Sequence, residues 1–205
     1  MIGKTNVKNV TSTRLGVNVK ESILTAGAAL LKERGIAALT QPKVARAAGI
    51  KQSHLTYYFP TRAKLLLGIA EHTVTTAMAH IAQCLAANPQ REMLASTLSE
   101  IMIAGLPPRV VIGLIVAADA EPGIREPLCE LIRDVRARIQ SLLATAGLAA
   151  SADAALLFHA AVVGLAVMHQ ARMSSESADE VGSGVASMLK LLALPVHDIG
   201  WGEGE

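Results

Sequence analysis

The chain has 205 residues, of which 51% are hydrophobic and 2% aromatic, and its formal net charge at pH 7 is +2. A core with so few aromatic side chains must be built from Ala, Leu, Val, Ile and Met, which suits packed helices. Alternating β-branched runs are scarce, so we expect an all-α fold without a sheet. The apolar runs are too short or too interrupted to span a bilayer, and no residues have metal-ligand spacing, so we expect no membrane segment and no metal site.

Charge is divided unevenly along the chain. Residues 1–64 contain 11 Lys/Arg and 2 Asp/Glu, whereas residues 65–205 contain 8 and 15. A basic N-terminal part on an acidic body is typical of nucleic-acid-binding proteins. A basic helix on a membrane surface would also be positive, but here the charges span several short elements. Nucleic acid is therefore the predicted partner.

The first predicted helix follows a segment without helical periodicity. Residues 1–17 are rich in Thr, Asn and Lys, and we interpret them as a flexible basic arm. Asn18 and Glu21 are spaced like a capping box and predict the start of the helix, and Gly35 is placed to end it.

The segment from Leu39 to Leu66 predicts two short helices joined by a glycine turn. Thr40 can cap the first helix, Gly49 lies where the chain reverses, and the second helix covers residues 52–58. This pattern fits a helix-turn-helix, whose second helix enters the major groove of DNA. An ordinary surface hairpin is the alternative, but the cations here, with no acid between residues 34 and 70, favour an anionic partner.

Residues 19–67, about a quarter of the chain, resemble the DNA-binding domain of the TetR family of bacterial transcriptional regulators. The matching pieces are LLKERGIAALT, VARAAGI and HLTYYFPTRAKLL. The resemblance implies a three-helix domain with base contacts from the second short helix and a phosphate-binding cation at Arg62. Two positions depart from the family pattern, Lys51 for a usual serine and Thr56 for a usual tyrosine, and both bear on the operator sequence.

We predict DNA contacts from polar and aromatic residues on and beside the two short helices. Gln52 is expected to contact adenine and Lys51 guanine, since their side chains can bond base edges in the major groove. The others add base or phosphate contacts that set the register. The full set is Thr40, Lys43, Lys51, Gln52, Ser53, His54, Thr56, Tyr57, Tyr58, Arg62 and Lys64.

Six further helices are predicted downstream, which makes about nine in total. Their ranges are 61–87, 90–104, 108–120, 124–146, 152–173 and 178–194. In the helix over 124–146, Arg133, Arg136 and Arg138 are expected to form a solvated face with nearby acids. The expected organisation is an arm (1–17), a DNA-binding domain (18–64), a helical ligand-binding and dimerisation domain (65–194) and a tail (195–205).

The helix over 152–173 has almost no polar face, so one side of it is predicted to pack on a partner. Two copies of this helix and the last one would form a four-helix interface on a two-fold axis, and glycines there suit close approach of two backbones. The predicted interface residues are Leu157, Ala161, Gly164, Leu165, Met168, Gly184 and Met188.

The TetR resemblance also implies a small-molecule pocket between the helices of the body. With few aromatic walls, such a pocket suits an apolar or acyl-like ligand. The candidate pocket residues are His72, Met78, Met102, Cys129, His159 and Met168. Cys84 and Cys129 are isolated, and we interpret them as buried thiols of a protein in a reducing cytoplasm.

The sequence therefore favours a sequence-specific, homodimeric transcriptional regulator, a repressor released from a palindromic operator by a ligand. The alternative is a sequence-neutral architectural DNA binder without ligand control. No Gly-rich phosphate loop, H-E-x-x-H motif or nucleophile elbow is present, so we expect neither an enzyme nor a cofactor.

Overall fold

The computed structural model describes residues 7–88, 90–104 and 106–193, and this part of the chain contains nine α-helices, two short 3-10 helices and no strand. The all-α prediction is confirmed. The helices are α1 Val7–Arg34, α2 Gln41–Ala47, α3 Gln52–Tyr58, α4 Arg62–Ala87, α5 Arg91–Ile103, α6 Leu106–Ala120, α7 Arg125–Thr145, α8 Ala152–Arg172 and α9 Ser175–Leu191, with 3-10 helices η1 Ile36–Ala38 and η2 Pro122–Ile124.

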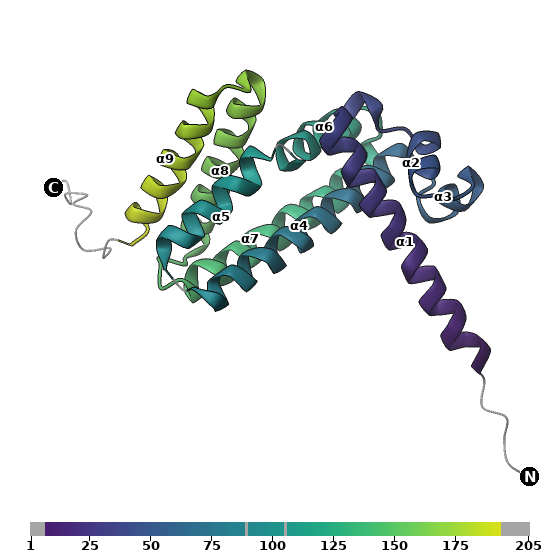
Figure 1. The fold of residues 1–205 in the computed structure, drawn as a ribbon, viewed down its shortest axis with the longest axis horizontal. Coiled ribbons are helices and arrows are strands. Elements are labelled where there is room, and N and C mark those ends of the chain that lie inside the picture. The colour runs from purple at the N-terminus through teal and green to yellow at the C-terminus, as the bar shows by residue number, and fades with distance from the viewer. Residues whose placement is uncertain (1–6, 89, 105, 194–205) are drawn as a thin grey trace, which may run out of the picture.

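The molecule is elongated, with α2 and α3 at one end and α9 at the other (Figure 1). Helices α4 and α7 run side by side between these ends and contact each other. Helix α1 packs against α2, α4 and α6, and its N-terminal part extends away from the body. The small helices therefore sit on one end of a long helical body.

Two groups of buried side chains form the core. The first contains side chains of α1, α2, α3, α4 and α6, and it includes Leu31, Leu55, Leu66 and Leu114. The second joins the C-terminal half of α4 with α5, α7, α8 and α9 around Phe158. Helix α6 therefore packs with the N-terminal helices, although α5 lies between α4 and α6 in the sequence.

Local sequence explains where α4 begins and where α2 and α3 are separated. Thr61 begins α4, because its hydroxyl oxygen accepts a hydrogen bond from the Lys64 backbone N–H at 3.1 Å. Gly49 has φ +68, a backbone conformation that residues with a Cβ adopt rarely, and it makes the turn between α2 and α3. The glycine turn matches the prediction, whereas Thr40 begins α2 without the side-chain capping bond that was expected of it.

The largest departure from the predicted elements is at the start of α1. The helix begins at Val7, so residues 7–17, expected as an arm without regular structure, are helical. This segment contains no proline, and its one glycine, Gly16, costs about 1 kcal/mol in a helix, which is too little to interrupt it. Residues 1–6 of the expected arm, and the expected tail over 195–205, lie outside the described residues.

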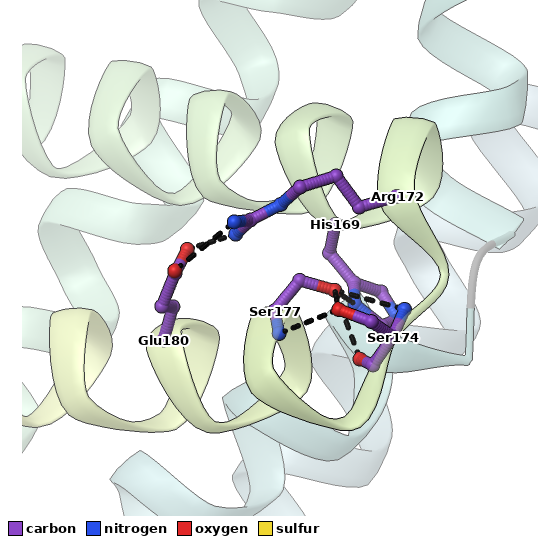
Figure 2. Close-up of polar contacts among 5 residues, drawn as sticks. All are labelled: His169, Arg172, Ser174, Ser177 and Glu180. Atoms are coloured by element: carbon purple, nitrogen blue, oxygen red, sulfur yellow. Dashed lines mark hydrogen bonds and ion pairs between the residues drawn. The ribbon is translucent and has the colours of Figure 1, made fainter.

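Helices α8 and α9 are joined by a tight corner with its own polar contacts (Figure 2). Ser174 and Ser177 form a capping box at the start of α9, and Nδ1 of the buried His169 lies 2.8 Å from the Ser177 hydroxyl. Arg172 of α8 forms an ion pair with Glu180 of α9. The hydroxyl of Ser177 donates its proton to the Ser174 carbonyl. The contact between Ser177 and His169 is therefore part of the hydrogen-bonded corner between α8 and α9.

Helix α8 is long and apolar enough to cross a membrane, with a mean hydropathy of 1.6 over its most apolar 18 residues, of which a third are buried. The expectation that no apolar segment reaches this length is therefore wrong for α8. An interior helix can be as long and as apolar, and α8 contacts α5, α6, α7 and α9.

The cysteines also differ from expectation, because Cys84 is half-buried and Cys129 is exposed.

Candidate DNA-binding surface and ligand cavity

Helix α3 presents a polar face to solvent. Leu55 is its one buried residue and fixes the helix on the core, whereas Gln52, Ser53 and His54 are exposed. Tyr57 is 80% exposed, and its ring meets that of Tyr58 edge-on with centroids 5.3 Å apart. Tyrosine is enriched at binding interfaces, so an exposed tyrosine on this polar face fits a binding surface.

The other predicted DNA contacts surround this face. Lys43, Lys51 and Lys64 are exposed, and Thr40 and Tyr58 are half-buried. The Thr56 hydroxyl donates to the Gln52 carbonyl at 3.0 Å. It is exposed, but its proton is engaged within the helix. The geometry gathers these residues at one end of the molecule, and their contacts with DNA stay predictions.

Arg62 has a role that the sequence did not reveal. Its Nε donates to the Leu39 carbonyl at 2.8 Å and its Nη2 donates to the Ile36 carbonyl at 2.9 Å. The guanidinium therefore fastens the start of α4 to the turn before α2. These carbonyl acceptors explain a cation in the first turn of a helix, where the dipole disfavours it, without an anionic partner.

A second side chain fastens the helix-turn-helix from within. The Gln41 amide donates to the Phe59 carbonyl at 2.7 Å, and Phe59 is the residue after α3. Together with Arg62, this bond holds the two short helices and the start of α4 in one orientation. The angle at which α3 is presented is therefore set by buried Leu55 and by these polar bonds.

A cavity of about 390 Å³ lies between α4, α5, α6, α7 and α8. Most of its lining is aliphatic, and Phe158 supplies an aromatic wall. Its polar lining residues are Thr73, Arg136 and His159, and no Asp or Glu lines it. Burial and the nearby Arg136 guanidinium lower the pKa of His159, which favours its neutral form.

Three of the predicted pocket residues line this cavity and three do not. Met78, Met102 and His159 are among the lining residues. His72 and Cys129 are next in sequence to the lining residues Thr73 and Leu128, but they are not lining residues themselves. Met168 of α8 is 53% exposed and is not among the lining residues either. These three residues do not line this cavity. The sequence shows the apolar stripe of a helix but not which neighbour it meets.

Arg136 is the cavity residue that the sequence analysis placed elsewhere. We expected it on the solvated face of α7 with Arg133 and Arg138. Those two arginines form ion pairs with acids of α7, whereas Arg136 follows the cavity-lining Leu131, Ile132 and Val135 at helical spacing. That spacing places Arg136 beside the apolar face of α7, but it does not show that this face borders a cavity.

Helix α6 touches both the cavity and the DNA-binding end. Val110 and Leu114 line the cavity and also belong to the first core. On the same helix, a Cβ at Gly113 would lie 2.4 Å from Ile36 Cδ1, so α6 packs very closely on η1. Arg109 Nη1 donates to the Lys32 carbonyl at the end of α1, at 2.8 Å.

The turn after α6 adds another bond to the DNA-binding end. The Thr61 hydroxyl, which caps α4, donates to Glu121 Oε1 at 3.2 Å. A displacement of α6 would therefore change contacts at the start of α4 and at the end of α1.

The predicted dimer residues divide into two groups. Leu157 and Met168 are 63% and 53% exposed, as expected of side chains that await a partner. Ala161, Gly164, Leu165, Gly184 and Met188 are half-buried. A Cβ on Gly184 would lie 2.7 Å from Leu165 Cδ1 of the same chain, so this glycine serves packing of α8 on α9 within one protomer.

Comparisons with known proteins agree with this geometry. The family model described as bacterial regulatory proteins, tetR family, matches residues 23–69. No curated protein matches the chain significantly. A putative TetR-family transcriptional regulator from Rhodococcus sp. has a TM-score of 0.64 at 20% identity, with 86% of this chain and 100% of that chain covered.

Two solved structures with bound small molecules are also similar. A putative transcriptional regulator from Saccharomonospora viridis in complex with choline has a TM-score of 0.62 at 17% identity, covering 85% of this chain and 96% of that chain. The multidrug binding protein EbrR, complexed with imidazole, has a TM-score of 0.58 at 18% identity, covering 83% and 94%. The resemblance is thereby confirmed: the chain carries the helix-turn-helix domain of the TetR family of bacterial regulators, within the fold of solved proteins of that family.

Proposed function

We propose that this protein is a sequence-specific transcriptional regulator that binds a palindromic operator as a homodimer and is released by a small molecule. The observation that carries the proposal is the exposed polar face of α3, held by Leu55 and by the Arg62 and Gln41 bonds within a TetR-type domain. In such a domain the second helix of the pair reads base edges and its neighbours hold phosphates.

Dimerisation is proposed through α8 and α9. Leu156, Leu157, Met168 and Leu191 are exposed apolar residues on these two helices. Covering them with a second copy removes apolar surface from water, and a two-fold axis gives two α3 helices for two half-sites. We therefore propose residues 18–64 as the DNA-binding domain and residues 65–194 as the dimerisation and ligand-binding domain.

Release by a ligand is proposed through α6. A molecule in the cavity would touch Val110 and Leu114 of α6. Helix α6 and the turn after it in turn contact Lys32, Ile36 and Thr61, as described above. A ligand that binds one position of α6 better than another shifts the equilibrium between two spacings of the α3 helices. The choline and imidazole complexes of similar folds support a small-molecule site in principle.

We further propose a cytoplasmic repressor without catalytic activity. Its partners would be double-stranded DNA, a second copy of the chain and an apolar or acyl-like ligand. The remaining alternative, an architectural binder without sequence preference, makes a different prediction for DNA binding, so one assay separates the two.

The test is fluorescence-anisotropy binding to the promoter DNA that flanks the gene, against a scrambled duplex of equal length, at two salt concentrations. A regulator should prefer the flanking DNA by about 10³-fold or more, and both affinities should fall as salt rises. Equal affinity for the two duplexes at both salt concentrations would contradict sequence-specific recognition of this DNA and favour the architectural alternative.

A further inference from the structure

The cavity is apolar inside but carries two basic side chains. Arg136 of α7 is exposed and His159 of α8 is half-buried, and both line the cavity. The Arg136 guanidinium is close enough to lower the pKa of His159. The two side chains therefore act on the same small region, at the boundary between the aliphatic interior and water.

The charge of this region is not compensated by the cavity walls. No acid is among the lining residues, and Arg136 makes no ion pair with the part of the chain that the structure describes. In contrast, Arg133 and Arg138 on the same helix are each paired with an acid of α7. Arg136 is thus a cavity-lining cation without an ion-pair partner among the described residues.

A ligand must satisfy both features. The aliphatic interior favours a hydrocarbon tail, because burying a polar group there without a hydrogen bond is unfavourable. A carboxylate at Arg136 would gain charge-assisted hydrogen bonds while staying near water, where its desolvation is small. A cationic head would meet like charge instead.

The volume limits the size of the tail. About 390 Å³ is near the lower end of the range for small-molecule sites, roughly 300–1,000 Å³. One aliphatic chain of medium length suits this volume better than a two-chain lipid.

We infer that the cavity binds an amphipathic anion, a single-chain aliphatic carboxylate, with its tail among the aliphatic side chains and its carboxylate at Arg136 and His159. The inference rests on the proposed ligand-binding function of the body and specifies the chemistry of the ligand.

The test is isothermal titration calorimetry of the full chain with three probes that share one tail: decanoate, decanol and decyltrimethylammonium. Decanoate should bind at least about tenfold more tightly than decanol, and the cation more weakly than decanol, because charge-assisted bonds form with the anion alone. Arg136→Gln should remove most of the preference for decanoate and leave decanol affinity within about twofold. Arg136→Lys should retain part of the preference for decanoate over decanol.

Arg133→Gln is the matched control, since it removes a charge from the same helix outside the cavity lining. It should leave the preference for decanoate unchanged. Equal binding of decanoate and decanol, tight binding of the cation, equal effects of the two Gln variants, or no binding of any probe would each overturn the inference.

A second readout separates this inference from the proposed function. Operator affinity is measured by anisotropy with and without each probe that binds. If decanoate binds through Arg136 without changing operator affinity, the ligand class stands and ligand control fails. If decanol binds as tightly as decanoate and releases DNA, ligand control stands and the ligand class fails.

Discussion

Replacing Arg62 by alanine tests the assignment of this residue as a structural fastener. The substitution removes two hydrogen bonds, to the carbonyls of Leu39 and Ile36 at 2.8 and 2.9 Å. The side chain is exposed, so each bond should contribute about 0.5–1.5 kcal/mol, or about 2 kcal/mol in total. For a chain of this length, that loss corresponds to a decrease in Tm of about 4–8 °C.

The assay is thermal unfolding of wild type, Arg62→Ala, Arg62→Lys and Arg46→Ala at one protein concentration. Arg62→Lys should lie between wild type and Arg62→Ala, because an ammonium cannot reproduce the guanidinium fork. Arg46 is an exposed cation on α2 and controls for loss of charge. If Arg62→Ala unfolds at the wild-type temperature, the stabilising role of the Arg62 hydrogen bonds is wrong, and the cation is better explained as a phosphate contact alone.

Three further predictions concern packing, assembly and pH. Gly68→Ala places a Cβ 2.7 Å from the ring of buried Phe59. Because the cost of overpacking exceeds the gain in helix propensity, a urea titration should show the free energy of unfolding lowered by about 1 kcal/mol. A stabilised variant would contradict this packing of Gly68 on Phe59. Leu157→Glu buries a charge in the proposed interface, and light scattering should show a monomer; a stable dimer would move the interface elsewhere. Because the pKa of His159 is lowered in the fold, the unfolded state binds its proton more readily and stability should fall as pH drops through about 6.5. His159→Gln should flatten this decline in a series of Tm measurements, and an unchanged decline would assign it to other groups.

Helix positions in the body were predictable because apolar periodicity is a local property. Helix α4 was expected over residues 61–87 and covers Arg62–Ala87, and α8 was expected over residues 152–173 and covers Ala152–Arg172. The helix-turn-helix was predictable for the same reason, since the glycine turn and the helical periodicity on either side of it act within a few positions.

What the sequence left open depends on contacts between distant segments. The periodicity of α7 does not say that Arg136 faces a cavity while Cys129 does not, because that depends on α4 and α8. The bonds from Arg62 to Leu39 and from Arg109 to Lys32 join residues 23 and 77 positions apart. Gly184 was assigned to a partner chain, although its neighbour is Leu165 of the same chain.

The central claim is that α3 reads the base sequence, and one measurement tests it most directly. Operator and scrambled duplexes are titrated with wild type, Gln52→Ala and Lys43→Ala. Gln52→Ala should cost about 1–3 kcal/mol on the operator and little on the scrambled duplex, whereas Lys43→Ala should weaken both and reduce the salt dependence. If the two variants weaken both duplexes alike, α3 does not read bases through Gln52 and the account of recognition is wrong.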